Sequence, residues 1–157
     1  MFQNGKIHDV VVKSLVKYVD ERGWLSELFR QDETVAEAMP VMAYISVTNP
    51  GVARGPHEHV DQTDYFAFIG PSDFKIYLWD NRKTSPTYMT RQLVFCGENA
   101  PKAVLIPPGV VHAYKNVGGK PGMVVNMPNR LFAGPGRKSP IDEIRHEDVS
   151  DSPFKLD

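Results

Sequence analysis

The apolar residues of this chain come in short bursts, and turn-forming residues separate one burst from the next. Examples are VMAYISV (41–47), DFKIYLWD (73–80) and KAVLIPP (102–108). Short length, enrichment in Val, Ile, Phe and Tyr, and flanking Gly, Pro, Asn and Asp are typical of β-strands, and about nine such segments are present. So many strands in a small domain favour an all-β sandwich or barrel.

The chain has 157 residues, which is enough to bury a sizeable core but is within the range of one domain. No low-complexity segment divides it, so we expect a single domain over 1–157. Only QDETVAEAMP (31–40) has helical character, with Asp32 as a possible cap and Pro40 just past the end. The polar stretch 134–157 predicts an irregular tail or a short helix over the core.

Charge and cysteine content narrow the class of protein. Lys and Arg number 18 against 19 Asp and Glu, so charge gives no reason to expect nucleic acid or a membrane surface as partner. Cys96 is the only cysteine, the N-terminus lacks the features of a secretory signal, and no apolar run approaches the roughly 18 residues of a membrane span. We therefore expect a cytoplasmic protein.

Three histidines stand in positions that could serve chemistry. His57 and His59 lie in GPHEH, and residues i and i+2 of a strand face the same side. His112 follows a Pro-Pro-Gly turn in IPPGVVHAYKN. Together with Asp64 they could hold zinc, iron, manganese or nickel, and the ligand set does not choose among these metals. Each histidine could instead move a proton or simply fill a strand.

Two spaced motifs resemble the signatures of the cupin superfamily. The first comprises Gly51, His57, His59, Asp64 and Gly70, and the second Pro107, Pro108, Gly109, His112 and Asn116. Most cupins have Glu where this chain has Asp64. The resemblance implies a jelly-roll barrel that holds one divalent metal through His57, His59, Asp64 and His112. Asp64 stands five residues after His59, so VDQT must turn or bulge for the two side chains to converge.

A closer resemblance covers almost the whole chain. The segments DERGWLSELFR, GVARGPHEH, WDNRKTSPTY, IPPGVVHAY and DEIRHED resemble, in order and spacing, the dTDP-4-dehydrorhamnose 3,5-epimerases, which are themselves cupins. The resemblance implies an isomerase without an organic cofactor that removes a proton next to the ketone of a nucleotide-linked 4-keto-6-deoxy sugar. It matches His57 to the catalytic base and Asp148 to the aspartate that orients it. It matches Arg22, Glu27 and Arg54 to substrate-binding residues, the arginines to those that bind the diphosphate.

The chain departs from the family at four positions. An ungapped comparison puts Asp64 at the lysine that stabilises the enolate, Val125 at the proton-donating tyrosine, Met42 at a glutamine that recognises thymine, and His59 at another glutamine. Because the changes at Asp64 and His59 complete a cupin metal set, we hypothesise that a divalent metal polarises the C4 carbonyl in place of the lysine.

Several alternatives remain open from sequence. A nitrogen bound to metal cannot also take a proton. Either His57 is a ligand and Glu58 or a metal-bound hydroxide is the base, or the site is metal-free and His57 acts with Asp148. The protein could also be a metal-binding cupin of other small-molecule chemistry or a non-catalytic sugar-binding cupin. Family members are homodimers in which an N-terminal strand crosses to the partner; segment 6–19 could supply this strand or an edge strand of its own barrel.

Overall fold

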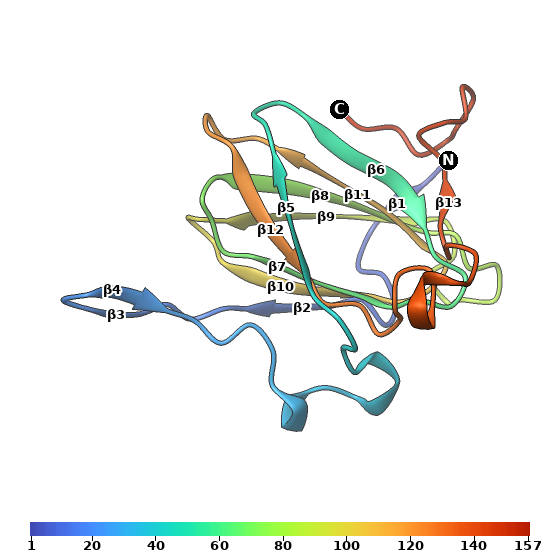
Figure 1. Cartoon of the computed structure of the whole chain (residues 1–157). Coiled ribbons are helices and arrows are strands. Elements are labelled where there is room, and N and C mark those ends of the chain that lie inside the picture. Colours follow the sequence, from blue (N-terminus) through green and yellow to red (C-terminus); the bar gives the residue numbers. More distant parts are fainter.

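Two β-sheets face each other, and a hairpin projects from them (Figure 1). The structure is a computed structural model that describes residues 1–157. The first sheet has the order β1 (Gln3–Asn4), β9 (Thr90–Gly97), β8 (Asp73–Asp80), β11 (Val110–Asn116), β6 (Ala53–Glu58) and β13 (Ile144–Arg145). The second has the order β2 (Val11–Ser14), β10 (Lys102–Ile106), β7 (Asp64–Phe68), β12 (Gly122–Asn126) and β5 (Tyr44–Thr48). The expected all-β architecture is confirmed.

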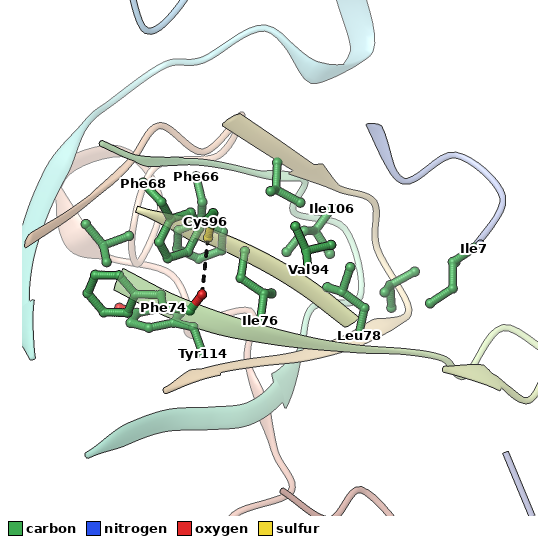
Figure 2. Close-up of a cluster of buried hydrophobic side chains, with 13 residues drawn as sticks. Ile7, Phe66, Phe68, Phe74, Ile76, Leu78, Val94, Cys96, Ile106 and Tyr114 are labelled. Carbon is green, nitrogen blue, oxygen red and sulfur yellow. Dashed lines mark hydrogen bonds between the residues drawn. The ribbon is translucent and has the colours of Figure 1, made fainter. Parts of the chain in front are cut away.

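Alternation along the strands builds the core. On β8, Phe74, Ile76 and Leu78 point between the sheets, whereas Tyr77 and Trp79 face outward into a separate cluster. Figure 2 shows the inner cluster, to which strands of both sheets contribute. The side-chain period of two in a strand therefore decides which residues face the interior, and the histidine strands follow the same rule.

Cys96 belongs to this inner cluster. Its thiol donates a weak hydrogen bond to the carbonyl of Phe74 at 3.8 Å, the dashed line in Figure 2. Burial raises the pKa of the Cys96 thiol, so the thiol stays protonated and unreactive.

The C-terminal segment covers the outer face of the six-stranded sheet. Phe154 packs against Trp79, with ring centroids 5.7 Å apart, and against Phe2 at 5.5 Å. This agrees with the expectation of an irregular tail over the core. The short strand β13 was not expected; it pairs with β6 and brings residues 142–147 beside the histidines.

The expected helix over 31–40 is wrong. The chain forms two 3₁₀ turns, η1 (Gln31–Glu33) and η2 (Ala36–Ala38), while a third, η3 (Pro135–Arg137), lies in the C-terminal segment. Thr34 and Val35 between the first two turns are extended, as their β-branched side chains favour, and Asp32 pairs with Arg30 instead of capping a helix. None of the helices has the length and apolar character to cross a membrane.

The N-terminal segment supplies an edge strand to its own barrel. Strand β2 pairs with β10 of the same chain in antiparallel register. The hairpin of β3 (Tyr18–Asp20) and β4 (Gly23–Leu25) follows and projects beyond the sheets at the left of Figure 1. Its apolar side chains are exposed, with Val19 at 76% and Leu25 at 60%.

The loop 81–89, which carries part of the WDNRKTSPTY segment, is held by one buried carboxylate. Asp80 accepts hydrogen bonds from Arg82 Nε at 2.9 Å and from the hydroxyls of Ser85 and Thr87 at 2.6 Å each. Burial raises the pKa of Asp80, but these bonds outweigh burial and lower the pKa to about 2. This segment is therefore a structural element of the barrel.

Candidate metal centre and active site

The four side chains predicted as metal ligands converge at one point. His57 lies near the end of β6, His59 follows that strand, His112 lies on β11 directly opposite His57, and Asp64 begins β7. One ligand atom from each side chain lies within 4.8 Å of those of the others. The side chains of His57 and His59 point toward the same cluster, as their spacing predicted.

Asp64 reaches the histidines from the other sheet. Residues 59–63 carry the chain from the six-stranded to the five-stranded sheet, which is the turn that the odd spacing required. Oδ2 of Asp64 lies 3.0 Å from His59 Nε2 and 3.1 Å from His112 Nε2. Its other oxygen, Oδ1, accepts hydrogen bonds from Gln62 Nε2 and Asn126 Nδ2, both at 2.9 Å. The carboxylate is thus fixed with one oxygen aimed between two imidazoles.

The tautomers of two histidines follow from their backbone contacts. Nδ1 of His59 contacts the carbonyl of Asp142, and Nδ1 of His112 lies 3.1 Å from the carbonyl of Val110. Because a carbonyl only accepts, each Nδ1 carries the hydrogen, and Nε2 of each neutral ring presents a lone pair. These lone pairs face Oδ2 of Asp64, which also only accepts.

Lone pairs that point at one another across the cluster are expected where a cation binds between them. Asp64 Oδ2 and His112 Nε2 lie at ion-pair distance but have no hydrogen-bond partner, and both are buried. Buried polar atoms in native proteins are rarely left without a partner. Metal-binding histidines typically donate their second nitrogen to a backbone carbonyl, as His59 and His112 do here. The residues present therefore fit a divalent metal.

The buried groups of the cluster shift one another's pKa values. Burial raises the pKa of the Asp64 carboxyl, but His112 and His59 outweigh burial, so the net pKa lies below its usual range and the group is ionised. Burial, reinforced by His112 and His59, lowers the pKa of His57 to about 2, so this imidazole is neutral at physiological pH. Burial lowers the pKa of His59, whereas Asp64 raises it to a net value above the usual one.

The site opens into a cleft of about 1180 Å³. Both sheets and residues 128–147 line it, and it contains four arginines: Arg54, Arg130, Arg137 and Arg145. Arg54 was predicted, and its guanidinium donates to the hydroxyl of Thr48 and to a backbone carbonyl. Arg130 and Arg137 were missed, although they lie in a Gly- and Pro-rich segment after the last long strand. The lining also contains four carboxylates, those of Asp61, Asp142, Glu143 and Glu147, so acidic and basic side chains are equal in number.

The structure does not bring two residues of the acid–base hypotheses, Asp148 and Glu58, to the histidine side of the cleft. Asp148 is exposed and forms no hydrogen bond or ion pair with His57; the nearby carboxylate is that of Glu143, whose Oε1 lies 3.9 Å from His57 Nδ1. Glu58 faces away from the cleft, because it alternates with His57 and His59, and it accepts a hydrogen bond from His146 Nε2 at 2.9 Å. Glu58 therefore cannot act as the base in the cleft.

Two predicted substrate-binding residues lie outside the cleft of their own chain. Arg22 is in the turn of the projecting hairpin, where its 81% exposed side chain pairs with Asp20. Glu27 follows the hairpin and pairs with Arg30. The barrel thus brings only Arg54 of the three predicted substrate-binding residues to the histidines.

Val125, which the ungapped comparison matched to the proton-donating tyrosine, does not face the histidines. Val125 packs on the outer face of its sheet, whereas Asn126 points inward and contacts Asp64. Opposite Asn126 on β5 stands Tyr44, whose hydroxyl accepts a hydrogen bond from Asn126 Nδ2 at 2.9 Å. Sequence reasoning missed Tyr44 and Asn126, although alternation along β12 was sufficient to find the latter. Met42 lines the cleft.

Comparison with known proteins agrees with this architecture. The sequence model of the dTDP-4-dehydrorhamnose 3,5-epimerase family matches residues 4–129. The chain is 35% identical over 127 residues to the probable low-salt glycan biosynthesis epimerase Agl13 of Haloferax volcanii, covering 80% of this chain and 81% of that protein. It is 34% identical over 119 residues to the spore coat polysaccharide biosynthesis protein SpsL of Bacillus subtilis, covering 76% and 78%.

A solved structure shares the cupin-type jelly-roll fold. The crystal structure of a dTDP sugar isomerase from Desulfovibrio desulfuricans superposes with a TM-score of 0.80 at 22% identity, covering 95% of this chain and 91% of that one. The fold agrees with the matches in sequence, which extend over most of the barrel. The chain belongs to the dTDP-4-dehydrorhamnose 3,5-epimerase family, a family of sugar epimerases.

Proposed function

We propose that this protein epimerises a nucleotide-linked 4-keto-6-deoxy sugar with the help of one divalent cation. The observation that carries the proposal is the convergence of the lone pairs of His59, His112 and Asp64, beside a cleft that His57, His59 and four arginines line. The family and the names of its relatives support the epimerase chemistry. The donor set, with imidazoles and one carboxylate, suits zinc, iron, manganese or nickel.

In this proposal His59, Asp64 and His112 hold the cation. Three protein ligands with a remaining open position are typical of catalytic zinc sites. A cation there supplies a Lewis acid that polarises the substrate carbonyl, the role for which the family uses a lysine. Gln62 and Asn126 keep Asp64 in place by bonding its second oxygen.

His57 is then the base. Unlike His59 and His112, its ring nitrogens make no hydrogen bond to a backbone carbonyl, and its side chain is 16% exposed at the edge of the cleft. Its neutral ring takes the proton from the carbon next to the ketone, and because its pKa is about 2 without substrate, this role requires that the carboxylate of Glu143 raise that pKa in the complex. Glu143 orients the ring, its 3.9 Å contact shortening when substrate enters, because catalytic hydrogen bonds often tighten only in the complex.

The arginines of the cleft account for the nucleotide end of the substrate. Guanidinium groups bind phosphate oxygens in bidentate fashion, and Arg130 and Arg137 offer such groups in the cleft, whereas Arg54 already donates from Nε and Nη2 and offers Nη1. Arg145 is already engaged by Glu143 at 3.3 Å. We expect the diphosphate to contact the first three.

Assembly and location extend the proposal. We expect a cytoplasmic homodimer; a free, buried Cys96 is compatible with a reducing compartment. The hairpin carries Arg22 and exposes four large apolar side chains to solvent, those of Tyr18, Val19, Trp24 and Leu25. Contact of this hairpin with a second copy would bury these side chains.

Elemental analysis and an epimerase assay test the proposal together. We expect near-stoichiometric metal in the purified protein, lost in His59→Gln along with turnover of a dTDP-linked 4-keto-6-deoxy sugar. His57→Ala should keep the metal and lose turnover, and the exposed His8→Gln is the matched control. Loss of metal in His57→Ala would make His57 a ligand and not the base. Full turnover by metal-stripped protein would refute the cation, and metal binding without turnover would favour a cupin of other chemistry.

A further inference from the structure

Tyr44 faces the histidines across the cleft. It lies on β5, the edge strand of the five-stranded sheet, whereas His57 lies on β6 of the opposing six-stranded sheet. Both side chains line the same cleft. A sugar bound between them would have the imidazole on one face and the phenol on the other.

The hydrogen of the Tyr44 hydroxyl is free to be donated. Asn126 uses its Nδ2 amide group twice, donating to the Tyr44 oxygen and to Oδ1 of Asp64, each at 2.9 Å. The Tyr44 oxygen is therefore an acceptor in this contact, and its own hydrogen has no acceptor in the protein. The second tyrosine of the cleft, Tyr114, differs because its hydroxyl is paired with Ser46 Oγ at 2.8 Å.

The position of Tyr44 suits an acid. The amide of Asn126 links it to the carboxylate that faces His59 and His112, so its hydroxyl is held near the floor of the cleft. The residue is 46% exposed, so part of its side chain is open to the water of the cleft. Burial of the rest of the side chain raises the pKa of Tyr44, so the hydroxyl is protonated at neutral pH.

Inversion of a carbon requires that a proton leave from one face and return to the other. We propose that Tyr44 is the catalytic acid that returns the proton from the face opposite His57; this inference rests on the epimerase function proposed above. His57 takes the proton as the C–H bond breaks, and the electron pair passes into the enolate. The O–H bond of Tyr44 then breaks as a C–H bond forms on the other face. Water reprotonates the phenolate and takes the proton from His57.

Exchange with solvent deuterium separates the two steps. The probe is a dTDP-linked 4-keto-6-deoxy sugar in D₂O, with NMR following both deuterium at the carbons beside the ketone and the inverted product. In Tyr44→Phe we expect deuterium incorporation within a few-fold of wild type, because His57 is intact, and inversion reduced by about 10²- to 10⁴-fold. Tyr88→Phe, on the remote loop 81–89, is the matched control.

The outcomes are distinguishable. Inversion at the wild-type rate in Tyr44→Phe, with exchange intact, would overturn the role of Tyr44 and leave the epimerase function standing. Absence of both exchange and inversion in wild type would refute the proposed function and this inference with it. Metal content and melting temperature of Tyr44→Phe equal to wild type would show an intact site. If that variant is unstable, Tyr44→His provides the second test, since an imidazole restores a donor and should recover part of the inversion.

Discussion

Asp142 should control both the stability of the β6–β7 turn and the affinity of the metal site. Its carboxylate accepts the backbone N–H groups of Val60, Asp61 and Gln62 at 2.7, 2.8 and 2.9 Å. Its own carbonyl accepts from His59 Nδ1. One residue of the C-terminal segment thus fixes the turn that leads to Asp64 and the tautomer of a proposed ligand.

The size of the effect of Asp142→Ala follows from these contacts. Hydrogen bonds to a charged group contribute about 1.5–3 kcal/mol each, but the three share one carboxylate and the released N–H groups can reach water, since Val60 is 70% exposed. We therefore expect a loss of about 3 kcal/mol, well below the simple sum. For a domain of this size that lowers the melting temperature by about 6–12 °C. The affinity for zinc should fall about 10- to 100-fold.

Thermal unfolding by circular dichroism and a competitive zinc titration would measure both effects. Asp148→Ala is the matched control, because Asp148 is an exposed aspartate of the same segment without contact to the histidines. The control should melt and bind as wild type does. A melting temperature of Asp142→Ala within about 2 °C of wild type would correspond to a loss of about 1 kcal/mol or less. That result would refute the role of Asp142 in stabilising the turn.

Three further predictions concern the barrel and its site. Gly55 has a φ of +79°, and a Cβ there would lie 2.6 Å from the carbonyl oxygen of His112 and 3.2 Å from His57 Nδ1. Gly55→Ala should therefore lower the free energy of unfolding, measured with denaturant, by about 2 kcal/mol or more, and it should lower the metal content. Asp80→Asn should lower the free energy of unfolding by about 2 kcal/mol at pH 7, because the folded pKa of Asp80, about 2, is below its unfolded value. This contribution to stability is fully present above about pH 4 and is lost as the pH falls through 2. A pH–stability curve of wild type equal to that of the variant would show that the carboxylate is unimportant. Zinc at 100 times its dissociation constant should stabilise wild type, but not His59→Gln, by about 2.7 kcal/mol, as measured by calorimetry. Equal stabilisation of both proteins by zinc would mean that the metal binds elsewhere.

The parts of the fold that sequence predicts are those with local causes. Strands follow from short apolar bursts, and the shared face of His57 and His59 follows from the period of two. Asp64 was placed correctly because VDQT allows a turn between the sheets. These predictions needed only residues close together in the chain.

The parts that failed depend on distant contacts or on a shift of one position. β13 has two residues and is a strand only because β6 lies beside it. Val125 and Asn126 face opposite sides of β12, and only Asn126 contacts Asp64, because neighbouring strand residues alternate in direction. Asp142 bonds residues 80 to 82 positions away, and no local pattern marks it. Glu143 was missed for Asp148 because the tail has no periodicity from which to read a face.

The proposed metal ligands come from both halves of the sandwich, and this affects how much folded protein a cell contains. His112 lies on the six-stranded sheet, His59 directly follows a strand of that sheet, and Asp64 lies on the other sheet, so an ion bound to these three would hold the two halves of the sandwich together. Because the site exists only in the folded chain, the free energy of binding would add to that of folding. A fall in the supply of the metal would then increase the unfolded fraction and its exposure to proteases. Metal availability would in this way set the abundance of the protein as well as its activity.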